Sequence, residues 1–522
     1  MSIRRSPAPT VLLASAAAAM GLVAPRSASA DPFSFTAGDL VVSTVSCSVA
    51  SCSGSSNNYG LDTASPIALQ EFQLGSGGTT ATTVGSLTLP QTQNGANAPI
   101  SGEYGSASEG ILQLSTNGQY LTMMGYGVNA NTFNSAPAST YGTAALGQTT
   151  SLLPAQQTGT VYATVPRVVA LIGGDGSVDT TTALTGVFNE NNPRSVATVN
   201  GSSFYVSGQG VTGDGTGGVF YAVKGATTAT PINANTSTPS GADTVNAATG
   251  TETRVVEISS VLTGTDTLYV SRDFSPKGTP NDSTDIRSLT DATTGGLPTS
   301  SNITATRLTN LNTSSGKGGN TLGGNDSSIN VTSGDENGVN DSRAGKFVYL
   351  SPEQFFFANA TTMYVADSGQ PKSGQPDAAA LGEGGLQKWS LVNGVWDLDY
   401  DLVSGLNLVD NSTATSGTPT NPGVTGLFGL TGEVVGNQVE LFATSYGLNE
   451  LSPSYLYEIT DTLSDTTISQ TTGETFTTLE SAPSDTLFRG VSFAPAPEPA
   501  SLAVLATGLA GLGLLRRRNV KA

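Results

Sequence analysis

The stretch Gly264-Thr-Asp-Thr-Leu-Tyr-Val-Ser271 decides the fold, because it joins a polar turn to a strand of the type aromatic-Val-small. An aliphatic strand precedes the turn, so the pattern predicts a β-hairpin in which Gly or Asn supplies a positive φ. Four further copies occur along the chain. They are Gln113-Leu-Ser-Thr-Asn-Gly-Gln-Tyr-Leu-Thr122, Val199-Asn-Gly-Ser-Ser-Phe-Tyr-Val-Ser207, Asn359-Ala-Thr-Thr-Met-Tyr-Val-Ala366 and Gly436-Asn-Gln-Val-Glu-Leu-Phe-Ala-Thr444.

Further strands follow these hairpins and complete a unit of about four antiparallel strands. A third strand is expected at 167–172, 218–223, 385–391 and 454–459, and a fourth at 178–184, 395–402 and 476–479. Repeats of a four-stranded sheet with Gly-rich turns are typical of a β-propeller, whose blades bury their faces against one another. The sequence therefore predicts an all-β propeller, with a pair of β-sandwiches or a β-helix as the alternative.

The two ends of the predicted body fit together as one blade. Leu487–Phe493 has the pattern of a first strand, but no partner strands follow it. Near the other end, the second to fourth strands of a unit are expected at Asp39–Val45, Ile67–Gln73 and Val84–Leu89. No first strand precedes them. A shared blade brings the count to six. The other blades are expected to begin near Ser108, Arg194, Arg254, Phe347 and Thr425.

The range 275–345 breaks the pattern. It is rich in Ser, Thr, Asn, Gly and Asp and has few large apolar residues, so it predicts a low-complexity insertion within a propeller at 31–494. A blade hidden after Arg272 would make the count seven.

The charge balance and the missing histidines exclude several functions. The chain has 21 basic residues, 40 acidic residues and no histidine. A strongly acidic chain is unsuited to nucleic acid, which needs Lys and Arg to displace counterions from phosphates. The lack of histidine removes Ser-His-Asp and Cys-His catalysis and histidine-ligated zinc. No catalytic residue is predicted from a motif, and no cofactor is expected apart from calcium.

Carboxylates and arginines supply the remaining candidate sites. Asp397, Asp399 and Asp401 alternate, so in a regular strand all three would project from one face and could bind Ca²⁺, or form a solvated edge. Arg194, Arg254 and Arg489 lie at or near the start of expected first strands. There they would meet an anionic ligand in a central channel or form ion pairs that stabilise the ring.

The only cysteines, Cys47 and Cys52, are close in sequence. In an oxidising compartment they would form a local disulfide, contributing about 2 kcal/mol by loop entropy. A free thiol pair and a metal site are the alternatives.

The N-terminus has the composition of a secretory signal peptide at 1–30. Arg4 and Arg5 precede an apolar stretch, and Ala28 and Ala30 fit a cleavage site before Asp31. The pattern predicts export across the inner membrane and cleavage by signal peptidase.

The C-terminus, 495–522, combines Pro497-Glu498-Pro499, an apolar span at 500–515 and the basic residues Arg516, Arg517 and Arg518. The span predicts a single transmembrane helix, although it is shorter than the usual length of about 20 residues, and the arginines would stay on the cytoplasmic side. This tail resembles the PEP-CTERM sorting signal of exported proteins from Gram-negative bacteria that make exopolysaccharide. The resemblance covers about the last 25 residues, and an ordinary membrane anchor is the alternative.

The PEP-CTERM resemblance implies recognition and cleavage by an exosortase-type membrane protease, with transient anchoring in the inner membrane and a final place in the cell envelope or outside the cell. Phe488-Arg-Gly-Val-Ser-Phe-Ala-Pro495 is loosely similar to the propeller-like regions of such proteins. We therefore expect a non-enzymatic propeller that binds or has a structural role, associated with exopolysaccharide. A carboxylate-dependent, calcium-assisted hydrolase or lyase acting on carbohydrates or esters is the second expectation, and ice or surface adhesion is the third.

Overall fold

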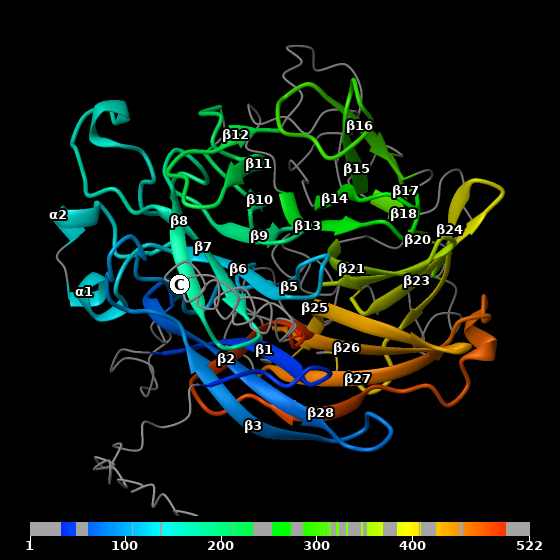
Figure 1. The fold of residues 1–522 in the computed structure, drawn as a ribbon. Coiled ribbons are helices and arrows are strands. Elements are labelled where there is room, and N and C mark those ends of the chain that lie inside the picture. Colours follow the sequence, from blue (N-terminus) through cyan, green and yellow to red (C-terminus); the bar gives the residue numbers. More distant parts are fainter. Residues whose placement is uncertain are drawn as a thin grey trace, which may run out of the picture. The chain divides into compact units, whose positions relative to one another are not determined.

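The computed structural model describes residues 33–47, 61–106, 108–135, 138–211, 213–232, 253–272, 285–308, 352–368, 384–406, 408, 424–447 and 453–496, with short strand segments between 311 and 347. These residues are nearly all-β, and four-stranded antiparallel sheets follow one another as a propeller (Figure 1). The predicted fold class is confirmed. Helical structure in this part of the chain is limited to α1 (Ala130–Ser135), α2 (Ala138–Tyr141), and the 3₁₀ turns η2 (Pro154–Gln156) and η6 (Ile468–Gln470).

Four sheets are separate and each has four strands in sequence order. The first contains β9 (Pro193–Ala197), β10 (Ser203–Gly208), β11 (Gly218–Val223) and β12 (Thr230–Pro231). The second contains β13 (Thr253–Ser259), β14 (Thr267–Arg272), β15 (Asp285–Asp291) and β16 (Ile303–Arg307). The third contains β21 (Pro352–Asn359), β22 (Thr362–Asp367), β23 (Leu386–Val392) and β24 (Val395–Leu402). The fourth contains β25 (Val424–Val435), β26 (Gln438–Gly447), β27 (Tyr455–Thr462) and β28 (Thr477–Ser481).

A nine-stranded sheet contains the remaining strands of the ring. One part of it is β29 (Thr486–Phe493), β1 (Leu40–Ser46), β2 (Ala64–Leu74) and β3 (Ala81–Thr88). The other part is β5 (Gln113–Leu114), β6 (Tyr120–Tyr126), β7 (Arg167–Gly173) and β8 (Val178–Leu184). The short strand β4 (Ser101–Glu103) pairs with both β2 and β6. Division at β4 would give the predicted six blades, but the pairing is continuous there, so the count of six stays a prediction.

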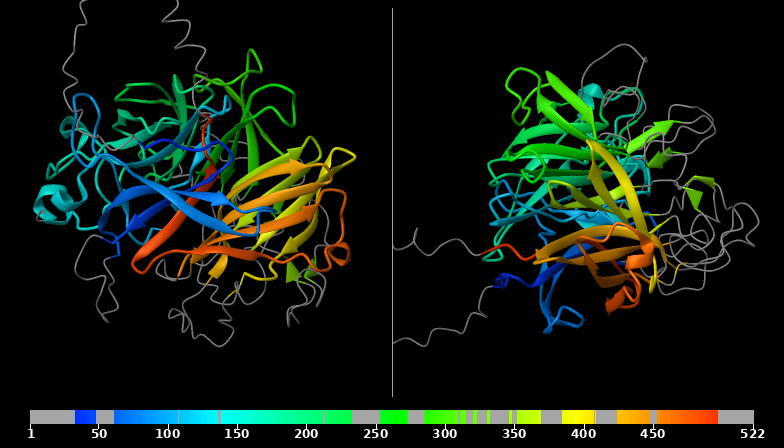
Figure 2. Two further views of the ribbon diagram at one scale, coloured as in Figure 1. Left: turned by 60° about the horizontal axis from the view of Figure 1, so that its bottom comes forward. Right: turned by 90° about the vertical axis from the view of Figure 1, so that its right-hand side faces the viewer.

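The two ends of the described body form one sheet, as the sequence predicted. The C-terminal strand β29 pairs antiparallel with β1, from Leu40 opposite Phe493 to Ser46 opposite Thr486. Figure 2 shows β29, in red, beside the blue β1. Phe488 and Val491 of β29 pack with Phe442 of β26 in an apolar cluster. The final sheet is therefore held to the sheet of β26 through a strand from the far end of the chain.

Two strands lie inside the range 275–345 that we predicted to be an insertion. β15 and β16 complete the sheet begun by β13 and β14. The buried side chains of Ile286 and Leu289 lie in two different apolar clusters, so β15 packs on both of its faces in an otherwise polar segment. The segment does not add a seventh four-stranded sheet among the described residues, whose other strands here form the pairs β17–β18 (Leu311–Ser314, Asn320–Leu322) and β19–β20 (Asn330–Val331, Lys346–Phe347).

The small residue that ends the repeated pattern often carries a hydroxyl group, which donates a hydrogen bond to the first strand of the next sheet or to the segment that leads into it. Ser271 at the end of β14 donates from Oγ to the carbonyl of Glu353 on the next sheet, at 2.8 Å. Equivalent bonds join Ser207 to Arg254 and Thr122 to Val196 (each 2.7 Å), Ser43 to Gly110 (2.5 Å) and Thr444 to Arg489. The copy that ends in Ala366 has no hydroxyl at this position. Its junction instead uses Thr425 Oγ1, which donates to the Ser368 carbonyl at 2.9 Å.

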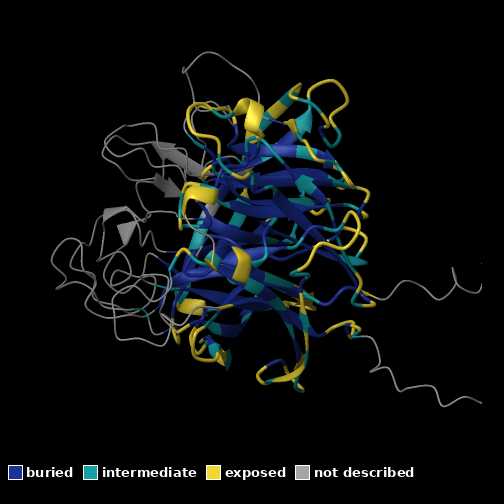
Figure 3. Cartoon of the chain, turned by 90° about the vertical axis from the view of Figure 1, so that its left-hand side faces the viewer, coloured by how far each residue is buried: buried dark blue, intermediate teal, exposed yellow. Residues whose placement is uncertain are grey.

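The core consists of apolar clusters between successive sheets, as expected when blades bury their faces on one another. Figure 3 shows the strands as mostly buried and the exposed residues mostly at turns. Near the centre of the ring the chain segments approach closely: a Cβ placed on Gly490 would lie 2.2 Å from the amide nitrogen of Leu112. Gly490 is therefore required where β29 passes the segment that leads into β5.

Candidate functional site

A polar cavity of about 310 Å³ lies among the loops of the propeller. Carboxylates, amides and arginines dominate its wall, together with one tyrosine. These side chains can form many hydrogen bonds in several directions. The wall offers little apolar surface for a hydrophobic ligand. The lining residues are Asp62, Glu103, Ser106, Ser108, Gly147, Gln148, Glu190, Asn191, Asn192, Arg194, Gln209, Arg254 and Tyr446.

All of these residues lie at the same end of the strands. Consecutive antiparallel strands alternate in direction, so connections from second to third strands and from one sheet to the next gather at one end. Asp62 precedes β2, Gln148 lies between β6 and β7, and Gln209 follows β10. Both ends of the described body lie at the opposite end, where Phe35 N donates to Gly174 O and Ala496 N donates to Gly118 O, at 2.9 and 2.8 Å. We call the two ends the cavity end and the terminal end.

Two of the three predicted channel arginines line this cavity. Arg254 forms an ion pair with Glu353 of β21, with Nη1 2.8 Å from Oε1, and both side chains are almost fully buried. Arg194 donates from Nη2 to Gln209 Oε1 at 3.2 Å. The Arg254–Glu353 ion pair agrees with the alternative that these arginines stabilise the ring. Both arginines also line the cavity, so binding of an anionic ligand stays a prediction.

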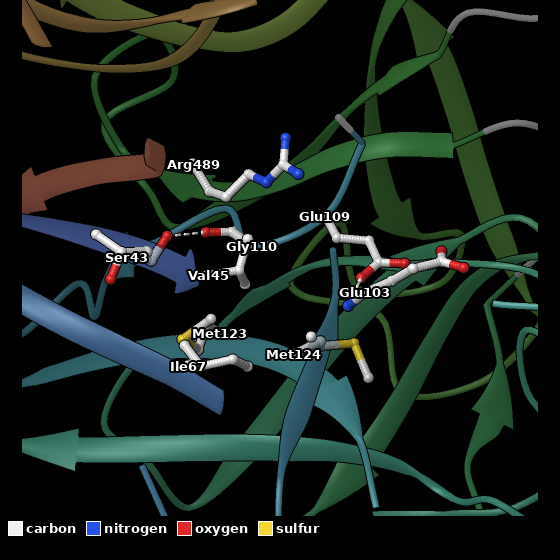
Figure 4. A pocket seen from close by; sticks show the side chains of 11 residues that line it. Ser43, Val45, Ile67, Glu103, Glu109, Gly110, Met123, Met124 and Arg489 are labelled. Carbon is white, nitrogen blue, oxygen red and sulfur yellow. Dashed lines mark hydrogen bonds between the residues drawn. The ribbon is translucent and has the colours of Figure 1, made fainter. Parts of the chain in front are cut away.

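The third arginine, Arg489, lines a smaller adjoining pocket rather than the main cavity. Figure 4 shows Arg489 above Ser43 and Gly110, with Glu103 and Glu109 on the other side of the pocket. Glu103 lines both spaces. The smaller pocket therefore adjoins the cavity at this carboxylate.

Glu103 and Glu109 form a buried carboxylate pair, which the sequence did not reveal. Asn192 Nδ2 contacts both groups, at 3.3 Å from Glu103 Oε2 and 2.5 Å from Glu109 Oε1. Gly147 N donates to Glu103 Oε1 at 3.0 Å, and Tyr126 donates its hydroxyl to Glu109 Oε1. One amide thus connects a carboxylate of the cavity wall to a carboxyl group behind it.

Burial raises the pKa of Glu109 above its usual value of 4.5, and hydrogen bonds from Tyr126, Glu103 N and Asn192 oppose this shift only in part. Burial, followed by the charge of Glu109, raises the pKa of Tyr126 well above its usual value, so Tyr126 remains a hydrogen-bond donor. The pair therefore places a carboxyl group with a raised pKa directly behind a carboxyl group of the cavity wall.

A buried arginine supports the loop between β8 and β9 that forms part of the cavity wall. Arg167 Nη2 donates to the carbonyls of Phe188 at 2.8 Å and Asn191 at 3.1 Å, and its guanidinium lies 4.7 Å from the centre of the Tyr126 ring. Phe188 and Glu190 in this loop have positive φ values of 48° and 51°, which are unfavourable for side chains with a Cβ. Such strain is typical of functional loops held by their surroundings.

The predicted aspartate row does not have the regular spacing that a single-faced row needs. In the pairing of β23 with β24, Lys388 faces Tyr400 and Trp389 faces Leu398, so Asp399 is the extra residue of a β-bulge. Asp399 accepts from Ser390 Oγ at 2.5 Å, and Asp401 is fully buried. The side chain of Asp397 lies outside the described residues. In the described part of the chain, no three acidic or thiol groups gather closely enough to hold a metal ion. Calcium binding stays a prediction.

The remaining predicted sites lie outside the described residues. They are the cleavage residues Ala28, Ala30 and Asp31, the second cysteine Cys52, the sorting motif Pro497, Glu498 and Pro499, the span 500–515, and Arg516, Arg517 and Arg518. Among the residues that the structure describes, no helix is both long and apolar enough to cross a membrane. Cys47 follows directly after β1, and its pairing with Cys52 stays a prediction.

No protein family and no curated protein matches this chain. Among solved structures, it is similar to a putative 6-phosphogluconolactonase from Bacteroides uniformis, with 13% identity, a TM-score of 0.34, and coverage of 85% of this chain and 83% of that one. It is also similar to an oligogalacturonate lyase in complex with manganese, with 9% identity, a TM-score of 0.31, and coverage of 76% and 85%. These matches assign no ligand or reaction to this chain.

Proposed function

We propose that this chain is an exported, non-enzymatic propeller that binds a saccharide in the cavity and acts in the cell envelope or extracellular matrix. The cavity carries the proposal, because its amides, carboxylates and arginines offer the paired donors and acceptors that sugar hydroxyls need. The signal peptide and the PEP-CTERM-like tail support export and sorting by signal peptidase and an exosortase-type protease. An exopolysaccharide of the producing cell is the natural source of the saccharide.

Titration of neutral and acidic oligosaccharides into the purified protein tests this function. Gln148 is exposed in the cavity wall, so Gln148→Ala removes hydrogen bonds to a ligand with little effect on folding. We expect the dissociation constant to rise about 3- to 10-fold, the equivalent of one neutral hydrogen bond. Gln119→Ala at the terminal end is the control and should bind like the wild type. Failure of every oligosaccharide to bind would reject the proposal.

A second function is favoured by the Glu103–Glu109 pair: a hydrolase or lyase acting on carbohydrates or esters. Two carboxyl groups beside a cavity, one of them with a pKa raised by burial, are the minimum that glycoside cleavage requires. A panel of glycan and ester substrates, with and without EDTA, distinguishes the two functions. Turnover that is lost in Glu103→Gln would establish the enzyme. Inhibition of this turnover by EDTA, reversed by added calcium, would support a role for calcium.

A further inference from the structure

A lysine and an aspartate meet in the dry interior between two sheets. Lys388 of β23 and Asp461 of β27 are both fully buried, and Lys388 Nζ lies 2.7 Å from Asp461 Oδ2. Nζ also lies 2.9 Å from the Tyr400 hydroxyl and 2.7 Å from the Thr462 carbonyl. All three ammonium hydrogens thus have acceptors, and the amine nitrogen is fixed against the carboxyl group of Asp461.

Two tyrosines polarise the carboxyl group of Asp461. Tyr400 donates to Oδ1 at 2.6 Å, and Tyr364 donates to Oδ2. Burial, followed by the charge of Asp461, raises the pKa of both tyrosines far above the usual value, so both keep their protons. Donors fixed on both oxygens stabilise the negative charge that develops when a nucleophile attacks the carboxyl carbon.

Glu474 adds a third reactive group to the cluster. Its Oε1 accepts from Thr462 N at 3.3 Å, next to Asp461 in the chain. Burial and then a hydrogen bond to Asp461 raise the pKa of Glu474 to about 8, so it carries a proton near neutral pH. The Thr462 contact places this protonated carboxyl group near Asp461, the residue before Thr462.

We propose that Lys388 and Asp461 join in an intramolecular isopeptide bond. One ammonium proton passes to the Asp461 carboxylate, which gives a neutral amine and a neutral acid. Lys388 Nζ then attacks Asp461 Cγ, and the Nζ–Cγ bond forms. Glu474 gives its proton to the departing hydroxyl and takes one from Nζ. The Cγ–O bond breaks and one water molecule leaves, while Glu474 ends as it began and no oxidant or cofactor is consumed.

The surroundings favour this condensation over a permanent ion pair. Fixed contact between nucleophile and carbonyl replaces a bimolecular encounter by an intramolecular one, with a large effective concentration. Burial of an ion pair is costly, and the neutral amide removes both charges from the interior. The bond would also tie β23 to β27, so that two neighbouring sheets gain a covalent link without using a cysteine.

Peptide mapping of the purified full chain tests the proposal. The folded protein is denatured, digested with trypsin together with a protease that cleaves after Glu, and analysed by mass spectrometry. Cleavage after Glu433 and Glu458 separates the two residues in the chain. We therefore expect one branched peptide made of the segments 384–433 and 459–474, one water lighter than their sum, with no cleavage after Lys388. Separate linear peptides carrying unmodified Lys388 and Asp461 would overturn the proposal.

A matched pair of variants tests the role of Glu474. Glu474→Gln keeps the shape of the side chain but removes the acid, so we expect folded protein without the branched peptide. Glu458→Gln changes another glutamate near this site, on β27 itself, and should retain the branched peptide. Circular dichroism establishes that each variant is folded. A branched peptide in Glu474→Gln would refute proton transfer by Glu474. Loss of the branched peptide in folded Glu458→Gln would show that the effect is not specific to Glu474.

Discussion

The propeller contains two buried carboxyl clusters that are similar in chemistry and differ in access. In each, tyrosine hydroxyls donate to a carboxyl group: Tyr126 to Glu109 in one, Tyr364 and Tyr400 to Asp461 in the other. The Asp461 cluster encloses its own cation, Lys388, away from solvent. The Glu109 cluster is connected through Asn192 to the cavity wall. Each cluster contains a glutamate whose pKa is raised by burial, Glu109 in one and Glu474 in the other. The two clusters therefore differ chiefly in whether a ligand in the cavity can reach them.

The largest expected effect is in the sealed cluster. Lys388→Met leaves Asp461 buried without its lysine partner, and we expect the free energy of unfolding to fall by about 3–5 kcal/mol. Urea denaturation at pH 7 measures the change. Lys224→Met is the control, because Lys224 pairs with Asp179 at 2.9 Å on the surface and its loss should cost less than about 1 kcal/mol. Equal effects in the two variants would contradict the distinction between sealed and exposed charge.

A smaller effect is expected in the cluster next to the cavity. Glu109→Ala leaves the Tyr126 hydroxyl without its acceptor and removes one of the acceptors of the Asn192 amide, at a cost of about 1–3 kcal/mol. Glu109→Gln keeps an acceptor oxygen and should be close to the wild type in the same urea experiment. A large loss in the Gln variant would show that the charge of Glu109, rather than its hydrogen bonds, holds this site together.

The smallest effect is a dependence of stability on pH. Because the pKa of Glu109 is raised in the folded state, the folded protein keeps a proton that the unfolded chain releases above 4.5. The stability from this group is therefore complete below that value and falls as the pH rises toward the raised pKa. One proton accounts for at most about 1.4 kcal/mol per pH unit. Thermal melts of the wild type and Glu109→Gln from pH 4 to 8 should show a shallower decline in the variant, and parallel declines would contradict this role of Glu109.

The repeated hairpins and the shared final sheet could be predicted because they depend on local patterns. Turn residues and alternating apolar positions mark each strand, and incomplete patterns at the two ends indicated their pairing. β15 and β16 were missed because Ile286 and Leu289 are isolated among polar residues. The carboxyl clusters were missed for a different reason. Glu109 and Asn192, or Lys388 and Asp461, are far apart in sequence, and only the arrangement of sheets brings them together.

Arg194 and Arg254 were within reach of sequence reasoning because first strands of successive blades must surround one centre. The aspartate row illustrates the opposite case. Alternation in sequence gives a common face only while the strand stays regular, and the bulge at Asp399 interrupts it. No residue pattern in this segment marks the bulge.

The pairing of β29 with β1 determines how the molecule responds to mechanical tension. Phe493, the last residue of β29, lies opposite Leu40, the first residue of β1. The chain therefore enters β1 and leaves β29 at the same end of the strand pair. A force that pulls Ala496 away from Phe33 first breaks the bonds of Ala496 to Gly118 and of Phe35 to Gly174, and then loads the Leu40–Phe493 pair. The hydrogen bonds then break one after another, as in a zipper, and each break needs little force. The ring therefore opens at its closure under a weak pull, long before its other sheets separate.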